Sequence, residues 1–172
     1  MNKNLDRLAE SSLSSKWQST DSCWPIENLE ETIALGKDLV QTIPHVKLIL
    51  LKGSLGAGKT CLVKGMALGL GIKEPITSPT FPLAQHYHSG HQPLFHLDLY
   101  RLEEGKSANQ LFIQEEEEAK DFNALMVVEW PERLSLWLPE AWRIKIEHCS
   151  NGKRWAHVYP PADSDRNSMT SW

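Results

Sequence analysis

Apolar residues in the first third of the chain follow helical spacing and then strand spacing. Between positions 29 and 43, apolar or small residues recur at every third or fourth position, which predicts an amphipathic helix. They are Leu29, Ile33, Gly36, Val40 and Ile43. Asn28 is a favourable N-cap, and Glu31 stands three residues later, where a capping box needs an acid. The apolar run 46–51 follows and predicts a buried strand.

A second helix is predicted for 60–70, because the apolar residues again have helical spacing and Gly69 and Gly71 act as stop signals. Segments 83–87 and 94–100 have strand character and are joined by a turn-rich stretch.

The next segment, 103–122, is acidic and mostly helical in character. Its run of four glutamates, 115–118, is either a partner surface or a solvated helix face, and such runs are more often the latter.

The second half of the chain adds a buried strand and a hairpin. The short apolar run 125–128 ends on Glu129, as a central parallel strand would. Segments 143–148 and 154–159 flank a turn with Asn151-Gly152, a strong hairpin signal. Together the elements predict an α/β fold, with a mainly parallel sheet flanked by helices and antiparallel additions that include the C-terminal hairpin.

Length and composition favour one ordinary globular domain. Residues 24–159 form the predicted domain, 1–23 a Ser-rich extension expected to be disordered, and 160–172 a loose tail. The net charge is −4 and no lysine–arginine cluster is visible, so direct DNA binding is not expected. The chain has neither a membrane-length apolar run nor a secretory apolar core, and its three widely spaced cysteines suit a reducing cytoplasm.

The candidate chemistry begins with a phosphate-binding loop. Residues 53–60 read GSLGAGKT and match the pattern G-x-x-x-x-G-K-[ST] at every fixed position. Glycines allow backbone N–H groups to approach phosphate oxygens, while Lys59 adds a positive charge. The Thr60 hydroxyl is a suitable hard ligand for Mg²⁺. A strand precedes the loop and a helix follows it, so we expect a P-loop NTPase-type fold that binds ATP and Mg²⁺.

The remaining site candidates lie where strands end. Glu129 and Asp98 are the two acids that can hold or orient Mg²⁺, and strand context ranks Glu129 nearer the ion. Thr80 either contacts the γ-phosphate or its Mg²⁺, or only caps the turn at Pro79. The expected catalytic residues are Lys59, Asp98 and Glu129, and the expected metal ligands are Thr60, Glu129 and Asp98. The expected nucleotide-binding residues are Gly53, Ser54, Leu55, Gly56, Ala57, Gly58, Lys59, Thr60, Cys61 and Thr80.

Several other residues also suggest chemistry. Four histidines cluster in sequence, at positions 86, 88, 91 and 96, but none has helix spacing with an acid. A metal site among them is therefore less expected than strand-face or turn positions. Trp130, beside Glu129, either stacks or docks a partner or belongs to the core or its rim.

Four blocks in order resemble one protein family. They are GSLGAGKT at 53–60, TSPTF at 77–81, HLDLYRL at 96–102 and VEWPER at 128–133. The set is similar to the bacterial TsaE (YjeE) ATPases, over roughly residues 26–159. Where many relatives have a second threonine after GKT, this chain has Cys61.

The resemblance implies a small P-loop ATPase with weak turnover on its own. Such proteins dock with ATP onto the TsaB–TsaD pair and support repeated threonylcarbamoyl transfer to the adenosine beside the anticodon of tRNA. The tRNA is thus a partner only through the complex. Carried onto this chain, Lys59 and Thr60 take the phosphate and Mg²⁺ roles, Asp98 is the acid of the HxDxYR block, and Glu129 is the Mg²⁺ neighbour.

Two other functions fit the loop. One is a small-molecule kinase, which would need an acceptor pocket and usually a basic lid, and no arginine-rich lid is visible. The other is a nucleotide-switched adaptor in which hydrolysis is incidental. A GTPase is disfavoured because no Asn-Lys-x-Asp block is present, so the choice of adenine rests on the resemblance. No arginine is obviously placed to stabilise charge, which predicts slow basal hydrolysis.

Overall fold

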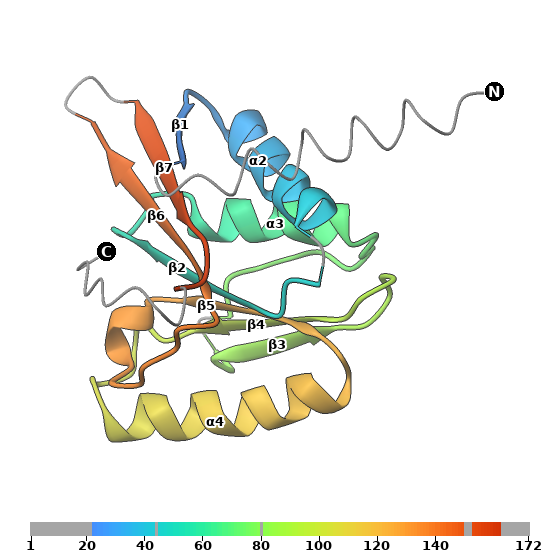
Figure 1. Ribbon diagram of the computed structural model, residues 1–172, viewed down its shortest axis with the longest axis vertical. Coiled ribbons are helices and arrows are strands. Elements are labelled where there is room, and N and C mark those ends of the chain that lie inside the picture. The colour runs from blue at the N-terminus through green and yellow to red at the C-terminus, as the bar shows by residue number, and fades with distance from the viewer. Residues whose placement is uncertain (1–21, 44, 80, 150–152, 163–172) are drawn as a thin grey trace.

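Seven strands form a single mixed sheet in the order β1-β7-β6-β2-β5-β4-β3 (Figure 1). The computed structural model describes residues 22–43, 45–79, 81–149 and 153–162. Helices α2 and α3 cover one face of the sheet and α4 covers the other, so two hydrophobic clusters lie on opposite sides of the strands (Figure 1). This three-layer arrangement confirms the predicted α/β fold.

Four parallel strands occupy the middle of the sheet, and antiparallel strands extend both edges. The parallel strands are β6 (Trp142–His148), β2 (Leu48–Gly53), β5 (Leu125–Glu129) and β4 (Leu94–Asp98). The antiparallel strands are β3 (Ala84–Tyr87), β7 (Arg154–Tyr159) and β1 (Ser22–Ile26). Strands β5 and β4 are buried along their whole length, and for β5 the continuous apolar run before Glu129 predicts this.

Strand β1 was not predicted from the sequence. It begins at Ser22 and pairs with β7, so the last two residues of the stretch expected to be disordered belong to the sheet. The strand is short and contains Pro25, which an edge strand tolerates because one side of it needs no ladder hydrogen bonds. Residues 1–21, residues 163–172 and the expected turn at Asn151-Gly152 lie outside the described residues.

Helix α2 (Leu29–Thr42) begins as the capping residues predict. The Asn28 side chain accepts a hydrogen bond of 2.8 Å from the backbone N–H of Glu31. The Glu31 carboxylate bonds back to the N–H of Glu27 at 2.8 Å. The buried face differs from the predicted stripe, because Leu29 is 46% exposed and the fully buried positions are Thr32, Leu35, Gly36 and Leu39.

Helix α3 (Lys59–Gly69) packs against α2 with the two backbones in close approach. A Cβ built on Gly65 would lie 2.0 Å from the carbonyl oxygen of Ile33, and one on Gly36 would lie 2.2 Å from that of Leu62. Gly69 is the last helical residue and packs against Val40. It therefore serves helix packing, whereas Gly71, at φ +77°, takes the left-handed conformation that ends helices.

Helix α4 (Lys106–Asp121) turns its acidic run partly inward. Ala108, Phe112, Glu115 and Ala119 face the sheet, and the outer positions of the helix are exposed. A short 3₁₀ turn, η1 (Pro131–Arg133), follows β5.

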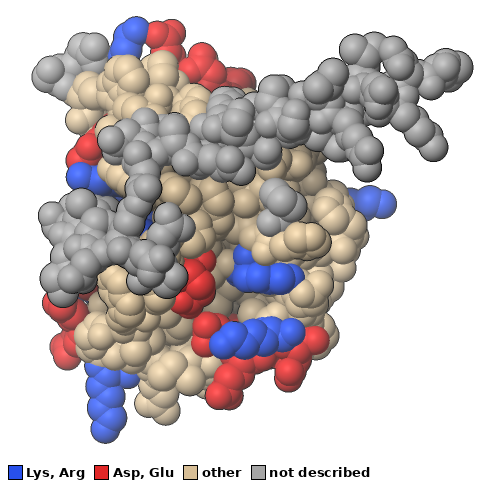
Figure 2. Space-filling model, in the orientation of Figure 1, with Lys and Arg blue, Asp and Glu red and all other residues tan. Residues whose placement is uncertain are grey.

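Charged side chains are spread over the molecular surface. On the face shown in Figure 2, lysine and arginine side chains are interspersed with acidic ones. None of the helices in the described parts of residues 22–162 combines the length and apolar character that a membrane span requires.

Candidate functional site

The phosphate-binding loop connects the C-terminal end of β2 to the N-terminus of α3. Gly58 is the N-cap of α3 and has φ +107°, a conformation that favours glycine. At Gly53 the loop passes so close to β6 that an added Cβ would lie 2.7 Å from the carbonyl oxygen of Ile146. The strand, loop and helix therefore stand in the predicted order, with the first backbone N–H groups of α3 at the loop.

Lys59 is buried within this loop. Its ammonium donates hydrogen bonds to the carbonyl oxygens of Gly53 at 2.8 Å and Ser54 at 3.1 Å. It also lies 4.1 Å from the ring centroid of Trp130. Burial lowers the pKa of Lys59 below its ordinary value, while the carboxylates of Glu129 and Asp98 act in the opposite direction. The loop thus holds a desolvated positive charge at its centre.

Glu129 connects the loop to the neighbouring strands. Its Oε1 accepts a hydrogen bond of 2.8 Å from the Thr60 hydroxyl and lies 2.9 Å from His96 Nε2. Glu129 and His96 are both buried, at 3% and 0% exposure. A threonine hydroxyl and a carboxylate oxygen side by side are the ligands that Mg²⁺ prefers, so the donor set fits this ion.

Asp98 is the register partner of Glu129 in the parallel pair β4–β5. Its Oδ2 accepts a hydrogen bond of 2.7 Å from the Ser78 hydroxyl, and its Oδ1 accepts one of 3.0 Å from the backbone N–H of Tyr100. The two acids therefore share one edge of the sheet but have different partners. Glu129 contacts the loop threonine directly, whereas Asp98 orders the segments at Ser78 and Tyr100.

These groups surround one cavity of about 460 Å³ at the carboxyl edge of the parallel strands. The cavity is lined by Leu55, Gly56, Ala57, Gly58, Lys59, Thr60, Cys61, Ser78, Asp98, Tyr100, Arg101, Glu129 and Trp130. Most of the residues predicted for nucleotide binding are therefore together. Gly53 and Ser54 contact the cavity-lining Lys59 through their carbonyls. Thr80 lies outside the described residues.

Sequence reasoning did not assign five residues that belong to this site: His96, Ser78, Tyr100, Arg101 and Trp130. His96 contacts Glu129, and Ser78 donates a hydrogen bond to Asp98. The signal that could have identified them is that they lie on segments next to these acids in the fold. For Trp130 the sequence leaves open a stacking or partner-docking residue or a residue of the core or its rim. Trp130 has φ +59°, and its N–H donates to the carbonyl oxygen of Leu51 at 3.2 Å, which turns its ring over Lys59.

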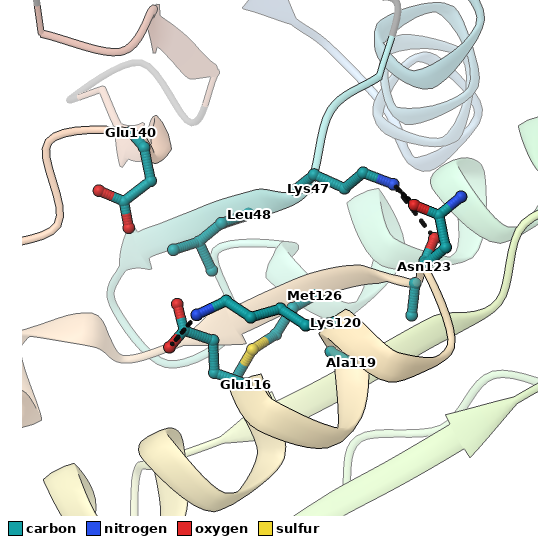
Figure 3. Close-up of a pocket in the computed structure, with 9 residues that line it drawn as sticks. Lys47, Leu48, Glu116, Ala119, Lys120, Asn123, Met126 and Glu140 are labelled. Carbon is teal, nitrogen blue, oxygen red and sulfur yellow. Dashed lines mark hydrogen bonds and ion pairs between the residues drawn. The ribbon is translucent and has the colours of Figure 1, made fainter.

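A separate cavity of about 420 Å³ lies at the opposite edge of the sheet, where β2 and β5 begin (Figure 3). Leu48 and Met126 form part of its apolar floor. At its rim Lys120 lies 2.9 Å from Glu116, and Lys47 donates to Asn123 (Figure 3). Glu140 also lines the cavity. None of the predicted site residues lines it.

Comparisons with known proteins agree on one family. The model of the family described as "Threonylcarbamoyl adenosine biosynthesis protein TsaE" matches residues 26–156. The tRNA threonylcarbamoyladenosine biosynthesis protein TsaE of Synechocystis sp. is 44% identical over 110 residues, covering 63% of this chain and 69% of that protein. The TsaE protein of Nostoc sp. is 39% identical over 131 residues, covering 76% and 81%.

A solved structure is also similar. The crystal structure of Bacillus subtilis YdiB superposes with a TM-score of 0.64 at 29% sequence identity, covering 83% of this chain and 86% of that one.

Proposed function

The chain belongs to the TsaE family of threonylcarbamoyl adenosine biosynthesis proteins, and from this premise we propose that it is a Mg²⁺-dependent ATPase. We propose further that it works with a TsaB–TsaD pair during threonylcarbamoyl transfer to tRNA in the cytoplasm. The contact between Thr60 and Glu129 carries the proposal, because it joins the phosphate-binding loop to a buried acid.

The loop supplies the groups that bind a triphosphate. The backbone N–H groups at the start of α3 and the ammonium of Lys59 neutralise phosphate charge. Lys59 gives its present hydrogen bonds to two loop carbonyls, and phosphate oxygens compete for the same donor. Because the ammonium is already buried, its interaction with phosphate is weakly screened by water.

The two acids have separate roles in this mechanism. Thr60 and Glu129 would hold Mg²⁺, and His96 orients the Glu129 carboxylate. The ion, when bound, neutralises charge that develops on the phosphate oxygens. Asp98, held by Ser78 and the N–H of Tyr100, orients the attacking water.

We expect slow turnover by the isolated chain, and the position of Arg101 supports this expectation. This arginine lines the cavity, which sequence reasoning did not anticipate, but its guanidinium carbon lies 4.6 Å from the ring centroid of Phe81. A charge held over that ring does not stabilise the transferring phosphate, so we expect a partner to complete the site.

Exposed apolar side chains near the cavity support docking of a partner there. Leu55 is 72% exposed and Tyr100 41% exposed, and both line the cavity. Phe81, under Arg101, is 77% exposed. Large apolar side chains grouped at a functional cavity are typical of an interaction surface. A partner on this surface would sense the nucleotide, which fits docking of the ATP-bound form onto TsaB–TsaD.

Phosphate release from ATP by the purified chain, alone and with TsaB–TsaD homologues, tests the proposal. We expect a low rate that rises at least tenfold with the partners and is abolished in Lys59→Ala. Lys64→Ala, which changes an exposed lysine on the same helix, is the matched control and should behave as the wild type. Normal turnover in Lys59→Ala would refute the ATPase site. Phosphate transfer to a small molecule, without a response to the partners, would identify a kinase instead.

A further inference from the structure

One histidine and two glutamates meet between the edge strand β3 and helix α4. His86 comes from β3, whereas Glu115 and Glu118 lie one helical turn apart on α4. His86 Nε2 lies 2.6 Å from Glu115 Oε2, and His86 Nδ1 lies 3.8 Å from Glu118 Oε1. One ligand atom from each residue lies within 4.8 Å of the other two. None of the three lines the nucleotide cavity.

Two of the three side chains are held in place by their surroundings. The His86 ring stacks on Phe95 of β4, with ring centroids 3.8 Å apart and planes inclined by 12°. Phe95 is fully buried, and Glu115 is only 7% exposed. Ligands that are already ordered lose little conformational freedom when an ion binds, which favours binding.

The cluster carries an excess of negative charge. In the part of the chain that the structure describes, neither Glu115 nor Glu118 forms an ion pair with a lysine or arginine. The nearby Lys120 pairs with Glu116 instead, at 2.9 Å. The three side chains therefore bring two carboxylates to the cluster, one of them buried. A buried carboxylate is costly unless a positive group or a metal ion compensates it.

We propose that His86, Glu115 and Glu118 bind a divalent transition-metal ion, for which Zn²⁺ is the best match. An imidazole nitrogen with two carboxylate oxygens suits Zn²⁺, whereas Mg²⁺ and Ca²⁺ prefer oxygen ligands alone. Three protein ligands leave the fourth tetrahedral position to water. The half-exposed Glu118 side chain leaves a path for the ion from solvent.

One ion binds only one ring nitrogen, whereas Glu115 lies next to Nε2 of His86 and Glu118 next to Nδ1, so binding requires the Glu118 side chain to turn toward Nε2. Zn–N and Zn–O bonds of about 2.0–2.2 Å place tetrahedral ligand atoms roughly 3.4 Å apart. His86 Nε2 and the Glu115 carboxylate must therefore move apart, while Glu118, 46% exposed and free to rotate at the surface, turns inward. The bound ion would join β3, which pairs only with β4 in the described sheet, directly to α4. It would thus strengthen an edge of the sheet.

Zinc titration by isothermal calorimetry tests the proposal, with excess Mg²⁺ present to occupy the oxygen-ligand site at Glu129. We compare the wild type with His86→Gln and Glu118→Gln. His157→Gln is the matched control, because His157 Nε2 also lies near a glutamate, 3.4 Å from Glu147 Oε2, and is similarly exposed.

We expect the wild type and His157→Gln to bind one more Zn²⁺ per chain than His86→Gln or Glu118→Gln. Zinc should raise the melting temperature of the first two proteins by several degrees more than that of the cluster variants. Because Glu118 is largely solvated, Glu118→Gln should fold normally even if His86→Gln does not, which circular dichroism would show. Unchanged zinc stoichiometry and affinity in Glu118→Gln, or loss of the site in His157→Gln, would overturn the proposal.

Discussion

At the level of single residues, Glu129 connects several parts of the proposed nucleotide site. Its carboxylate contacts the loop threonine, its other neighbour is the buried His96, and the next residue, Trp130, lies over Lys59. His96 Nδ1 has no hydrogen-bond partner among the described residues. The hydrogen bond of the imidazole is therefore the one between Nε2 and the Glu129 carboxylate. The carboxylate is therefore held in one orientation before any ion binds.

We expect Glu129→Gln to lower ATP hydrolysis by at least about 100-fold, because it removes the charge that holds Mg²⁺ while nearly keeping the side-chain shape. ATP binding should weaken much less, since the loop and Lys59 remain. Phosphate release and ATP titration on the same preparation measure the two effects. Glu117→Gln, at an exposed acid that lines neither cavity, is the control and should leave both unchanged. Wild-type turnover in Glu129→Gln would exclude Glu129 as the Mg²⁺ ligand.

Helices α2 and α3 show how packing between elements supports the site. Their backbones touch at Gly36 and Gly65, where any side chain would meet a carbonyl oxygen. Because α3 begins at Lys59, the close contact with α2 also sets the position of the phosphate-binding loop. Glycine at these two positions lets the helix backbones approach closely, although glycine in a helix interior costs conformational entropy.

We expect Gly65→Ala to lower the free energy of unfolding by about 1–3 kcal/mol, because its Cβ would lie 2.0 Å from the Ile33 carbonyl oxygen and the helices must separate. Urea denaturation measures the change. Leu68→Ala, on the same helix at a side chain that is 57% exposed, should cost much less. Equal free energies of unfolding for Gly65→Ala and the wild type would show that the two helices can move apart without a loss of stability.

In the whole molecule, the site exists because four parallel strands end at one edge. In the sheet register, Glu129 of β5 has Asp98 of β4 on one side and Leu51 of β2 on the other. The two acids therefore lie next to the phosphate-binding loop, which follows β2. Ligand binding at this edge engages strands from both halves of the chain. Nucleotide should therefore stabilise the complete domain and not only the loop.

We expect ATP with Mg²⁺, at 100 times its dissociation constant, to stabilise the folded chain by about 2.7 kcal/mol. The melting temperature should then rise by roughly 5–10 °C. Differential scanning fluorimetry measures the rise, with the same protein in ATP and EDTA showing the part that depends on Mg²⁺. The rise should vanish in Lys59→Ala. A similar rise in that variant would place the nucleotide elsewhere, for example in the separate cavity of Figure 3.

The strand, loop and helix around GSLGAGKT, the parallel strand that ends at Glu129, and the α/β class all follow from the amino-acid sequence alone. These features depend on neighbouring residues, through spacing, glycine conformation and capping. The four blocks also sufficed to indicate the family that the comparisons confirm. Strand β1 was not predicted, because its five residues include a proline and show no alternation of apolar and polar residues. Pairing with β7, and not a local preference of the sequence, holds this strand in place.

Which side chains meet depends on how distant segments pack in the folded chain. His96 reaches Glu129 and Ser78 reaches Asp98 because sheet register aligns segments that no sequence period relates. The same holds for the glutamate run, which reads as a solvated face until α4 packs on the sheet and turns Glu115 toward His86. A helical period shows which residues share a face, but the partner of that face is set by packing between distant parts of the chain.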